Sequence, residues 1–461
     1  MLYNSITPEL LKRFDIPGPR YTSYPTANRF VDSFTEEDYL QALADRHDGA
    51  IAGMPLSLYI HVPFCDSLCY YCGCNKIVTK HYDRAVPYLE TLYKEVALVV
   101  RTLESRQRVS QLHFGGGTPT FLSDDQLRHL MAFLREQFDF AKSAECSIEI
   151  DPRTVTHERL QNLWDMGLNR LSFGVQDFNP QVQEAVHREQ STQSVFALMQ
   201  DAREIGYTEI NVDLIYGLPR QTTETFKETL RQIVELKPDR LAVYGYAHLP
   251  HLFKPQRRIH EEELPDAGTR LSLLTMAIQE LQRAGYDYIG MDHFALPEDS
   301  LSVAKRKGLM HRNFQGYSTH ADCDLIGLGV SSISKVGAVY SQNAKTIEEY
   351  TEQVENGHLP VIKGVTLTRD DMIRRSVITA IMCQGEVLFE AIELGYMIEF
   401  KAYFAYELEQ LGKYVEEGFV EINDESIVVM PLGWYFIRAL AMVFDKYLQK
   451  PDSATRFSKI I

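Results

Sequence analysis

From about residue 56 to residue 244, short runs rich in β-forming residues alternate with longer amphipathic stretches. In the longer stretches apolar residues recur every three or four positions, and Asp or Thr stands near several of their starts, as in helices with one buried face. Strand–helix alternation repeated about six times predicts βα units, a parallel sheet and right-handed crossovers, in either an open barrel or a doubly wound sheet. The predicted strands are 57–62, 109–114, 147–150, 170–173, 209–214 and 240–244, and the predicted helices are 82–102, 124–137, 156–166, 194–205 and 223–236.

The two ends of the chain have a different pattern. Residues 1–50 show little strand pattern but contain a compact aromatic and proline segment, PGPRYTSYPTANRF. From about residue 366 the pattern predicts three helices and a hairpin centred on Asn423–Asp424. A winged-helix DNA reader would need a basic helix, whereas these helices are acidic or mixed, so we interpret this segment as a structural lid or a substrate-side domain. The helices are predicted at 367–385, 400–418 and 431–449, and the hairpin at 419–430.

Composition narrows the class of protein. A chain of 461 residues with 45% hydrophobic and 24% charged residues is typical of a globular protein of two or three domains. The net charge of −16 argues against a nonspecific nucleic-acid binder, although local Arg and Lys decide whether an anionic substrate binds. No apolar stretch is long enough for a membrane span, and the first residues lack the pattern of a signal peptide.

Cysteines are concentrated in one short segment. An odd number of cysteines, in a long chain without an export signal, does not favour a disulfide framework, so we expect a reducing cytoplasm. Of the seven cysteines, four fall within ten residues and three are scattered: Cys65, Cys69, Cys72 and Cys74 form the group, and Cys146, Cys323 and Cys383 stand alone.

The first three clustered cysteines have C-x3-C-x2-C spacing directly after a predicted strand. Three thiolates on one loop bind three irons of a cubane cluster and leave the fourth iron open. Structural zinc usually needs a second, distant cysteine pair, which this chain lacks, so zinc would require Cys74, His61 or His81 as a further ligand. Four buried cysteines without any ligand would have no packing reason. We therefore interpret the spacing as an iron–sulfur motif.

Further candidate ligands follow other predicted strands. The segment LHFGGGTP, 112–119, has three glycines that let a backbone approach a ligand closely. Glu149 and Asp213 are carboxylates at the ends of predicted strands, the edge where ligands gather in parallel α/β folds. Each carboxylate alone is equally consistent with a helix cap or a loop position.

The cysteine spacing, with the aromatic Tyr71 before the third cysteine, resembles the radical S-adenosylmethionine superfamily. In that superfamily the amino and carboxylate groups of the methionine moiety chelate the fourth iron. An electron from the reduced cluster then cleaves the sulfonium to give methionine and a 5′-deoxyadenosyl radical. The glycine segment is similar to the methionine-binding motif of the superfamily.

Longer motifs resemble one family within it, the oxygen-independent coproporphyrinogen III dehydrogenases. These motifs, from about residue 16 to the C-terminus, include GPRYTSYPT, HVPFCxxLCYYCGCNK, LHFGGGTPT, LSFGVQDFN, GMDHFA and HRNFQGY. The resemblance implies oxidative decarboxylation of the ring A and B propionates of coproporphyrinogen III to vinyl groups, which gives protoporphyrinogen IX in haem biosynthesis. It also implies an incomplete, open parallel βα barrel over 51–365, an N-terminal arm over 1–50 that covers the active site, and a mainly helical C-terminal domain over 366–461.

The same resemblance implies a set of cofactor contacts. A [4Fe-4S] cluster is bound by Cys65, Cys69 and Cys72 and carries exchangeable S-adenosylmethionine, and a second S-adenosylmethionine lies beside it. Cys74 is not expected to bind iron. Tyr59 and Gln315 are the possible catalytic residues. No residue is assigned as an acid or base, because the leaving group is carbon dioxide. The positions that match the two S-adenosylmethionine sites are Tyr59, Tyr71, Gly116, Gly117, Thr118, Glu149, Gln176, Arg188, Asp213, Ala247 and Ile333.

The substrate has four carboxylates, which an acidic chain must meet with local cations. The candidate substrate contacts are Arg20, Tyr21, Tyr24 and Arg312. Arg374 and Arg375 stand beside acidic residues in a predicted helix, and we interpret them as part of a solvated charged face.

Two related proteins stay open as alternatives, a haem-binding chaperone-like relative and a haem-degrading relative. Each of these relatives lacks at least one of two features, the C-x-C ending and the GPRYTSYPT arm. This chain has both. The reaction needs an electron donor and an acceptor that the sequence does not identify, and an arm and a lid within one chain are consistent with a monomer.

Overall fold

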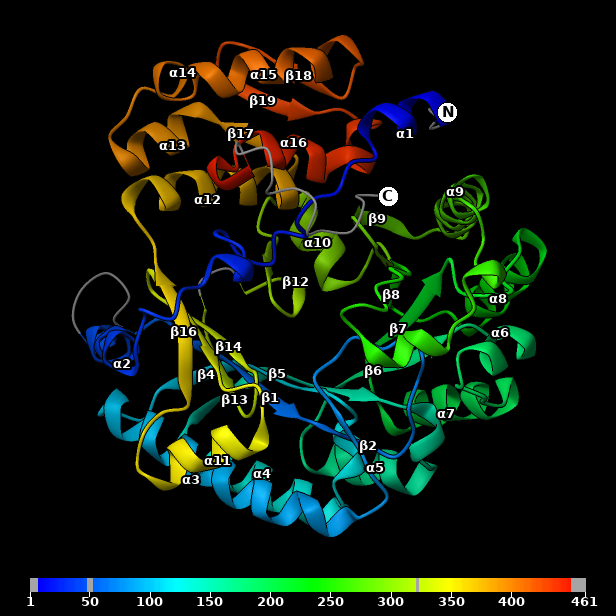
Figure 1. Cartoon of the computed structure of the whole chain (residues 1–461), viewed down its shortest axis with the longest axis vertical. Helices are drawn as coiled ribbons and strands as arrows, with labels where there is room; N and C mark the ends of the chain where they lie inside the picture. Colours follow the sequence, from blue (N-terminus) through cyan, green and yellow to red (C-terminus); the bar gives the residue numbers. More distant parts are fainter. Residues whose placement is uncertain (1–6, 48–52, 321–322, 449–461) are drawn as a thin grey trace. The chain divides into compact units, whose positions relative to one another are not determined.

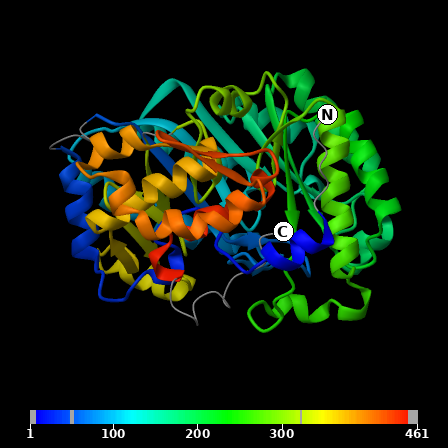
Figure 2. The same ribbon diagram turned by 90° about the horizontal axis from the view of Figure 1, so that it is seen from above.

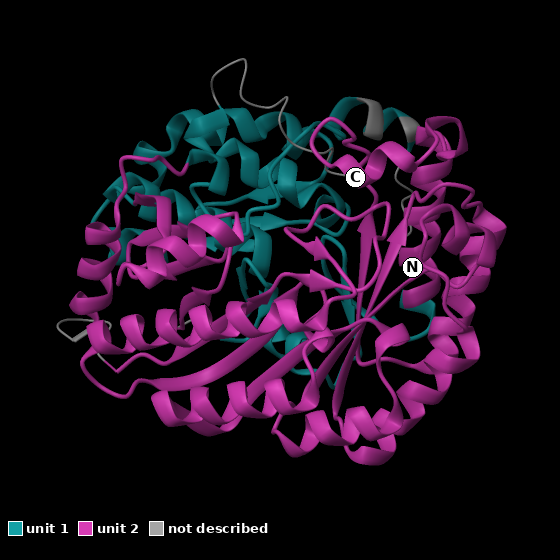
Figure 3. Ribbon diagram, turned by 60° about the horizontal axis from the view of Figure 1, so that its bottom comes forward, with its two compact units in different colours: residues 1–29, 282–321, 367–461 teal, residues 30–281, 322–366 magenta. Residues whose placement is uncertain are grey.

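The computed structural model describes residues 7–47, 53–320 and 323–448. The chain forms two compact units, and each is discontinuous in sequence (Figure 3). One unit consists of 30–281 and 322–366 and is called the sheet unit here; the other consists of 1–29, 282–321 and 367–461 and is called the helical unit. The division into 1–50, 51–365 and 366–461 follows the order of the chain and stays a prediction.

Six parallel strands form the centre of the sheet unit, as the alternating pattern predicted. The helices that connect these strands lie along one face of this sheet (Figure 1), and Figure 2 gives the view from above. All six predicted strands and all five predicted helices are confirmed. In sheet order, the strands are β1 (Leu56–Val62), β4 (Arg108–Gly116), β5 (Asp139–Ile150), β6 (Arg170–Gln176), β7 (Glu209–Tyr216) and β8 (Arg240–Gly245), and the helices are α3 (Ala85–Leu103), α4 (Asp124–Gln137), α5 (His157–Asp165), α7 (Thr192–Ile205) and α8 (Thr223–Leu236).

Alternation within each strand decides which side chains face the helices. In β1 the apolar Leu58 and Ile60 are fully buried, while the polar Tyr59 and His61 occupy the positions between and after them. Because successive side chains of a strand point to opposite faces, the apolar set packs under the helices and the polar set lines the other face. Side-chain caps start the helices, as at Ser123, whose hydroxyl accepts from the Gln126 amide.

The sheet continues on the other side of β1. Strand β13 (Asp324–Leu328) pairs with β1 in parallel, and β14 (Ile333–Val336), β15 (Val339–Asn343) and β16 (Val361–Thr366) add antiparallel strands. Within the sheet unit the order runs from β16 to β8, and these two strands are not paired with each other in the part of the chain described. With the long helices along one face, the sheet is the open parallel barrel that the family resemblance implied.

The helical unit contains the C-terminal elements. The predicted hairpin is confirmed, since β18 (Val420–Ile422) pairs with β19 (Ser426–Val429), and β17 (Glu386–Leu388) adds a third strand. The first predicted helix is also confirmed. The C-terminal helices are α12 (Arg369–Gln384), α13 (Phe389–Tyr396), α14 (Phe400–Tyr403), α15 (Ala405–Glu416) and α16 (Ile437–Val443).

Two of the predicted C-terminal helices are wrong as single helices. The stretch 400–418 is interrupted at Phe404, whose buried ring packs against Phe400 and Phe444. The stretch 431–449 starts with a 3-10 turn, because Gly433 lies so close to the chain that an added Cβ would be 1.9 Å from the Phe419 carbonyl oxygen. Close packing, aromatic at Phe404 and against the backbone at Gly433, therefore accompanies the interruption of the helices that periodicity alone predicted.

The predicted solvated face of α12 is also wrong in part. Only 12% of the Arg374 side chain is exposed, and it donates to carboxylates of Asp370 and of Glu407 on α15. Asp371 is buried because it caps the helix in a reciprocal pair with Thr368. This end of α12 is an internal ion-pair network.

The remaining elements include one long helix, α9, and several short helices and strands. No helix among the described residues has both the length and the apolar character needed to cross a bilayer. The elements are α1 (Pro8–Phe14), α2 (Glu36–Ala44), α6 (Pro180–Ala185), α9 (Ala267–Arg283), α10 (Ser300–Arg306), α11 (Ile347–Glu355), β2 (Phe64–Cys65), β3 (Ile77–Val78), β9 (Asp287–Gly290), β10 (His293–Ala295), β11 (His311–Asn313) and β12 (Gly316–Ser318).

Candidate active site

The cysteine loop follows β1 and is closed by its own short strand pair, β2 with β3. Two contacts fix the loop to the segment after α6: the Tyr70 amide donates to the Val186 carbonyl at 3.0 Å, and His187 Nδ1 lies 2.8 Å from the Leu68 carbonyl oxygen. The ring of Tyr70 stacks on that of His187, with centroids 5.1 Å apart. The cysteines are therefore held on a supported loop rather than a free one.

The four clustered cysteines differ in exposure and in contacts. Cys65 and Cys69 are buried, Cys72 is half-buried and Cys74 is exposed. Burial raises the pKa of the Cys65 thiol to about 11, although a hydrogen bond from Thr118 Oγ1 at 3.6 Å opposes this shift. A hydrogen bond from the Cys74 thiol, with the nearby positive charge of a lysine, lowers the pKa of Cys72 to about 6. Donors aimed at sulfur stabilise the thiolate form, which is the form that binds metal.

Arginine side chains surround the middle cysteine. Arg188 Nη1 donates to the Cys69 sulfur at 3.3 Å, and Arg153 Nη2 lies 3.7 Å from the same sulfur. Both arginines also pair with Asp151, at 3.2 and 2.7 Å. The negative charge of a cluster bound here would face two positive charges and one buried carboxylate.

The side chains around the cysteine loop can be compared with what a metal site needs. Among the described residues, no three His, Cys, Asp or Glu side chains converge on one point as a zinc ion requires. His61, one candidate for an additional zinc ligand, already contacts the Tyr59 hydroxyl and the Asn75 carbonyl through its two ring nitrogens. These contacts occupy His61 alone, so the further zinc ligands Cys74 and His81 are not tested and the choice between cluster and zinc stays a prediction. In a cubane cluster each thiolate binds a different iron atom. The three sulfurs therefore do not have to meet at one point, as the ligands of a single metal ion do.

The glycine segment at the end of β4 packs directly on the cysteine loop. The Gly117 amide donates to the Val62 carbonyl and the Thr118 amide to the Phe64 carbonyl, both at 2.8 Å. A Cβ added at Gly117 would lie 2.6 Å from the Phe64 oxygen and 3.0 Å from the Cys65 sulfur. Only glycine permits this approach, so the two motifs, about fifty residues apart, form one structure.

Glu149 connects this glycine segment to the polar face of the sheet. Its Oε2 accepts from the Gly116 amide at 3.1 Å, and its Oε1 lies 3.3 Å from His113 Nε2. Tyr59 stacks on the His113 ring, and its hydroxyl lies 3.1 Å from His61 Nδ1. The Glu149 side chain remains 43% exposed, so it retains capacity to accept from a ligand.

The polar face continues over β6 and β7. Asn211 donates to the Ser172 hydroxyl and to the Asp213 carboxylate, each at 2.8 Å, and Ser172 lies 3.4 Å from the second Asp213 oxygen. Burial raises the pKa of Asp213 to about 6. Sequence reasoning found Asp213 but missed His113, Ser172 and Asn211. The alternation of polar and apolar residues in their strands is the signal that could have found them.

Arg188 provides an unsatisfied donor at the edge of this face. Its Nη2 donates to the Gly174 carbonyl, but its Nε is buried and has no partner among the described residues. A Cβ added at Gly174 would lie 2.9 Å from Gln176 Nε2 and 3.0 Å from Arg188 Nη2, so these two side chains meet above the glycine. An orphaned guanidinium N–H suits a carboxylate brought by a ligand.

The remaining predicted cofactor contacts lie further along the strands. Tyr71 packs on a buried apolar cluster that includes Tyr246, and its carbonyl accepts from Gln256 Nε2 at 2.9 Å. Ala247 comes two residues after β8 ends. Ile333 opens β14, and its backbone contacts Gly327, the register partner of Tyr59 on β13. The predicted S-adenosylmethionine contacts thus lie on or next to the sheet, between strands β14 and β8. Their roles stay predictions.

The predicted substrate contacts belong to the helical unit. Tyr21 and Tyr24 are buried, and the Tyr21 hydroxyl donates to Asp445 at 3.0 Å. Gln315 lies in the turn between β11 and β12, and its Nε2 is buried without a partner in the described residues. The arginines of this group lie together, since Arg312 Nε donates to the Arg20 carbonyl at 3.2 Å.

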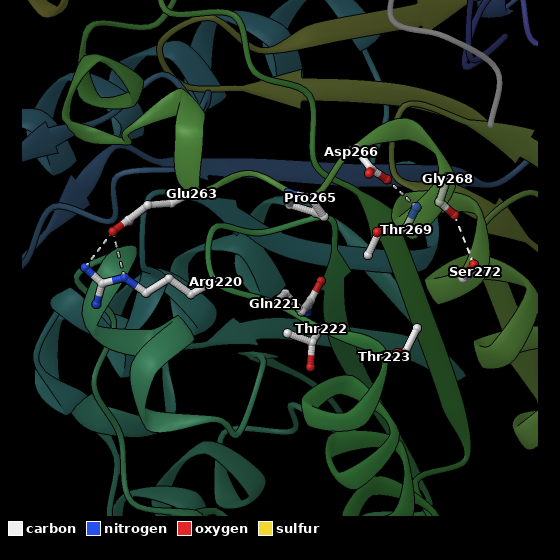
Figure 4. Close-up of a pocket in the computed structure, with 10 residues that line it drawn as sticks. All are labelled: Arg220, Gln221, Thr222, Thr223, Glu263, Pro265, Asp266, Gly268, Thr269 and Ser272. Atoms are coloured by element: carbon white, nitrogen blue, oxygen red, sulfur yellow. Dashed lines mark hydrogen bonds and ion pairs between the residues drawn. The ribbon is translucent and has the colours of Figure 1, made fainter.

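A separate hollow of about 690 Å³ lies at the start of α8. Figure 4 shows Arg220 paired with Glu263, and Asp266 accepting from the Thr269 amide. These charged groups already have partners, so we assign no cofactor to this hollow.

Comparisons with known proteins agree on one family. The model of the radical SAM superfamily matches residues 59–233. The oxygen-independent coproporphyrinogen III oxidase of Salmonella typhimurium is 48% identical, and that of Pseudomonas aeruginosa 46%, each over 98% of this chain and 98% of the relative. The solved structure of coproporphyrinogen III oxidase from Escherichia coli, described as a radical SAM enzyme, is 46% identical with a TM-score of 0.90, covering 94% of this chain and all of that one.

Proposed function

Because this chain belongs to the family of oxygen-independent coproporphyrinogen III oxidases, we propose that it converts coproporphyrinogen III to protoporphyrinogen IX in haem biosynthesis. The two propionates that react are those of rings A and B. The observation that supports this most directly is the contact between the cysteine loop and the glycine segment, at Gly117 and Cys65. It joins a candidate cluster site to a candidate amino-acid site at one edge of a parallel sheet.

Three thiolates would hold the [4Fe-4S] cluster, those of Cys65, Cys69 and Cys72. Their support is the shared loop and the donors from Thr118 and Arg188 to two of the sulfurs. When bound, the cluster and S-adenosylmethionine supply one-electron chemistry that yields a 5′-deoxyadenosyl radical.

Two S-adenosylmethionine molecules would bind along the polar face. The backbone at Gly116 and Gly117 suits an amino-acid moiety, and the orphaned Arg188 Nε suits a carboxylate. Glu149 and Asp213 would accept from amino or hydroxyl groups. The chemistry of these donors and acceptors supports the assignment of contacts to the two molecules.

In the overall reaction each propionate loses one hydrogen atom from its β-carbon, one CO2 and one electron, and a vinyl group remains. No proton needs to be held by a base of matched pKa, so the chain's own residues act by binding, orienting and excluding water. The reaction needs a one-electron donor and a one-electron acceptor, which we leave unidentified.

We also propose that the chain works as a monomer in the cytoplasm. All seven cysteines are free, which suits a reducing compartment. The arm with the candidate substrate contacts belongs to the same chain as the cysteine loop, so no second copy is needed to supply it.

The test uses anaerobically reconstituted protein with dithionite, S-adenosylmethionine and coproporphyrinogen III. Protoporphyrin is followed by fluorescence after oxidation, and 5′-deoxyadenosine by chromatography. We expect both products, and Cys69→Ala abolishes both. Cys146→Ala is the matched control, because Cys146 is also buried but lies in β5 away from the cysteine loop, and it should retain iron and both products.

Other outcomes would contradict the proposal. Formation of 5′-deoxyadenosine without protoporphyrin would keep the radical chemistry and move the substrate to a related tetrapyrrole. A tight haem complex without either product would favour a chaperone-like protein.

A further inference from the structure

Three arginines of the helical unit meet at one short stretch of the N-terminal arm. Arg20 forms an ion pair with Asp292. Arg312 Nε donates to the Arg20 carbonyl at 3.2 Å, and Arg438 Nε donates to the Pro19 carbonyl at 2.9 Å. We call these four charged residues the arginine cluster: Arg20, Arg312, Arg438 and Asp292.

Two members of the arginine cluster are buried, and the four residues together carry three positive charges against one negative charge. Arg312 is 8% exposed and Arg438 is 5% exposed. Asp292 supplies one negative charge, Arg312 donates to the Arg20 carbonyl, and Arg438 donates to the Pro19 and Gly18 carbonyls. Burial, followed by the charge of Arg20, lowers the pKa of Arg438 to about 10. Excess positive charge removed from water is unfavourable unless an anion compensates it.

One donor of the arginine cluster has nothing to bond. Arg312 Nη1 is buried and has no hydrogen-bond partner among the described residues. The position of the guanidinium is nevertheless fixed, because it lies over the Tyr317 ring at 4.6 Å from the centroid and its Nε is bonded to the arm. A fixed charged donor without a protein acceptor is placed to bond an acceptor that a ligand brings.

We propose that the arginine cluster binds a carboxylate, and that this carboxylate is a propionate of the tetracarboxylate substrate. The identity of the ligand rests on the proposed function. A substrate with four carboxylates must be bound by a chain of net charge −16, so a local excess of guanidinium groups is needed. Arg438 and Asp292 are the new members; Asp292 acts as the internal counter-ion that occupies the guanidinium donors until the substrate arrives.

The experiment measures equilibrium binding of coproporphyrin III, the oxidised and unreactive tetracarboxylate, to cluster-loaded protein by fluorescence under anaerobic conditions. Arg312→Met and Arg438→Met should each weaken binding roughly 10- to 100-fold, as expected for loss of a charge-assisted hydrogen bond. Arg29→Met is the matched control, since Arg29 likewise bonds a backbone carbonyl and lies over a tyrosine ring, both of Tyr447, outside the arginine cluster. It should change binding less than twofold.

Asp292→Asn separates ligand binding from a purely structural role. If the arginine cluster binds carboxylates, removing its internal counter-ion should tighten coproporphyrin III binding several-fold while lowering thermal stability without ligand. If the cluster only holds the arm, Asp292→Asn should weaken binding in proportion to the lost stability, and that result would overturn the proposal. Arg438→Lys, which keeps the positive charge, is the second variant in case Arg438→Met does not fold. It should bind coproporphyrin III more tightly than Arg438→Met and more weakly than the wild type.

Failure of this inference is distinguishable from failure of the proposed function. Suppose that the wild type forms protoporphyrin and that Arg438→Met does so with an unchanged KM for coproporphyrinogen III. The proposal of a carboxylate site is then wrong, and the proposed function is supported. If the wild type does not convert coproporphyrinogen III but the arginine variants lose coproporphyrin III binding, the site stands and the function is wrong.

Discussion

Arg188 donates a hydrogen bond from Nη1 to the sulfur of Cys69 at 3.3 Å, although the two residues are 119 positions apart in the chain. The same nitrogen lies 3.2 Å from Asp151 Oδ2, and Nη2 donates to the Gly174 carbonyl. One guanidinium group thus contacts a candidate cluster ligand and offers its free Nε to a candidate ligand carboxylate. A change at Arg188 should affect both cofactors.

We predict that Arg188→Lys raises the KM for S-adenosylmethionine about tenfold or more. Lysine keeps the charge but cannot reach the sulfur, the carboxylate and the carbonyl together from one planar group. The measurement is 5′-deoxyadenosine formation against S-adenosylmethionine concentration. Arg170→Lys is the control, because Arg170 is also paired in the sheet, with Glu145 and Glu209, but at the start of β6. An unchanged KM in Arg188→Lys would contradict the assignment.

We predict that Gly117→Ala loses most of its iron. The added Cβ would lie 2.6 Å from the Phe64 oxygen and 3.0 Å from the Cys65 sulfur, so the cysteine loop must move. Iron and sulfide content after anaerobic reconstitution measures the effect. Gly412→Ala in α15 is the control, because nothing lies within 4 Å of its added Cβ and a helix interior favours alanine. If Gly117→Ala still binds a full cluster, the cysteine loop does not depend on the close contact of residue 117 with Phe64 and Cys65.

The strands around the site could be predicted because their side chains alternate and glycines or helix caps follow them. The strand 209–214, for example, lies within the observed Glu209–Tyr216. The pairing of β13 with β1 could not be predicted, because it joins residues more than 260 positions apart through backbone hydrogen bonds that leave no sequence pattern. The discontinuous helical unit was missed for the same reason.

Prediction of the site was limited in a similar way. Motifs identified Glu149 and Asp213, but not the His113 and Asn211 side chains that hydrogen-bond to them. Arg438 was missed because it is a single cation in an apolar helical stretch, and its contact with Pro19 depends on chain segments from opposite ends of the sequence. Residue type reveals chemistry, whereas partners depend on tertiary structure.

We predict that the affinity for S-adenosylmethionine rises as pH increases from 5 to 7. Burial raises the pKa of Asp213 to about 6, so the carboxylate loses its proton in this interval and becomes able to accept from a ligand hydroxyl or amino group. Asp213→Asn should bind more weakly at pH 8 and lose the pH dependence near 6. Equilibrium binding of S-adenosylmethionine from pH 5 to 8 measures both. An identical pH profile in the variant would exclude Asp213 as the titrating group.

We predict that the free energy of unfolding contains a contribution from Glu95 that decreases as pH rises from about 4.5 to 7. Burial raises the pKa of this carboxyl to about 7 in the folded protein, against 4.5 for an exposed Glu, so the folded state binds the proton more tightly and is favoured at lower pH. Its oxygens accept from the Gly329 amide, Asn343 and Tyr350.

Glu95→Gln tests this contribution. The variant should be less stable by about 1–3 kcal/mol at low pH, because its amide nitrogen faces a donor, and this difference should shrink as pH rises toward 7. It should also lose part of the pH dependence that denaturant unfolding shows in the wild type. Equal pH slopes in the two proteins would contradict the assignment to Glu95.

The most direct test of the proposed reaction follows the hydrogen that leaves the propionate. The substrate is coproporphyrinogen III deuterated at the propionate β-carbons, and the measurement is the mass of the 5′-deoxyadenosine formed together with the amount of protoporphyrin. We predict that 5′-deoxyadenosine carries one deuterium and that two molecules form for each protoporphyrin, one for each propionate. Unlabelled 5′-deoxyadenosine, or labelled product without protoporphyrin, would contradict radical decarboxylation of this substrate.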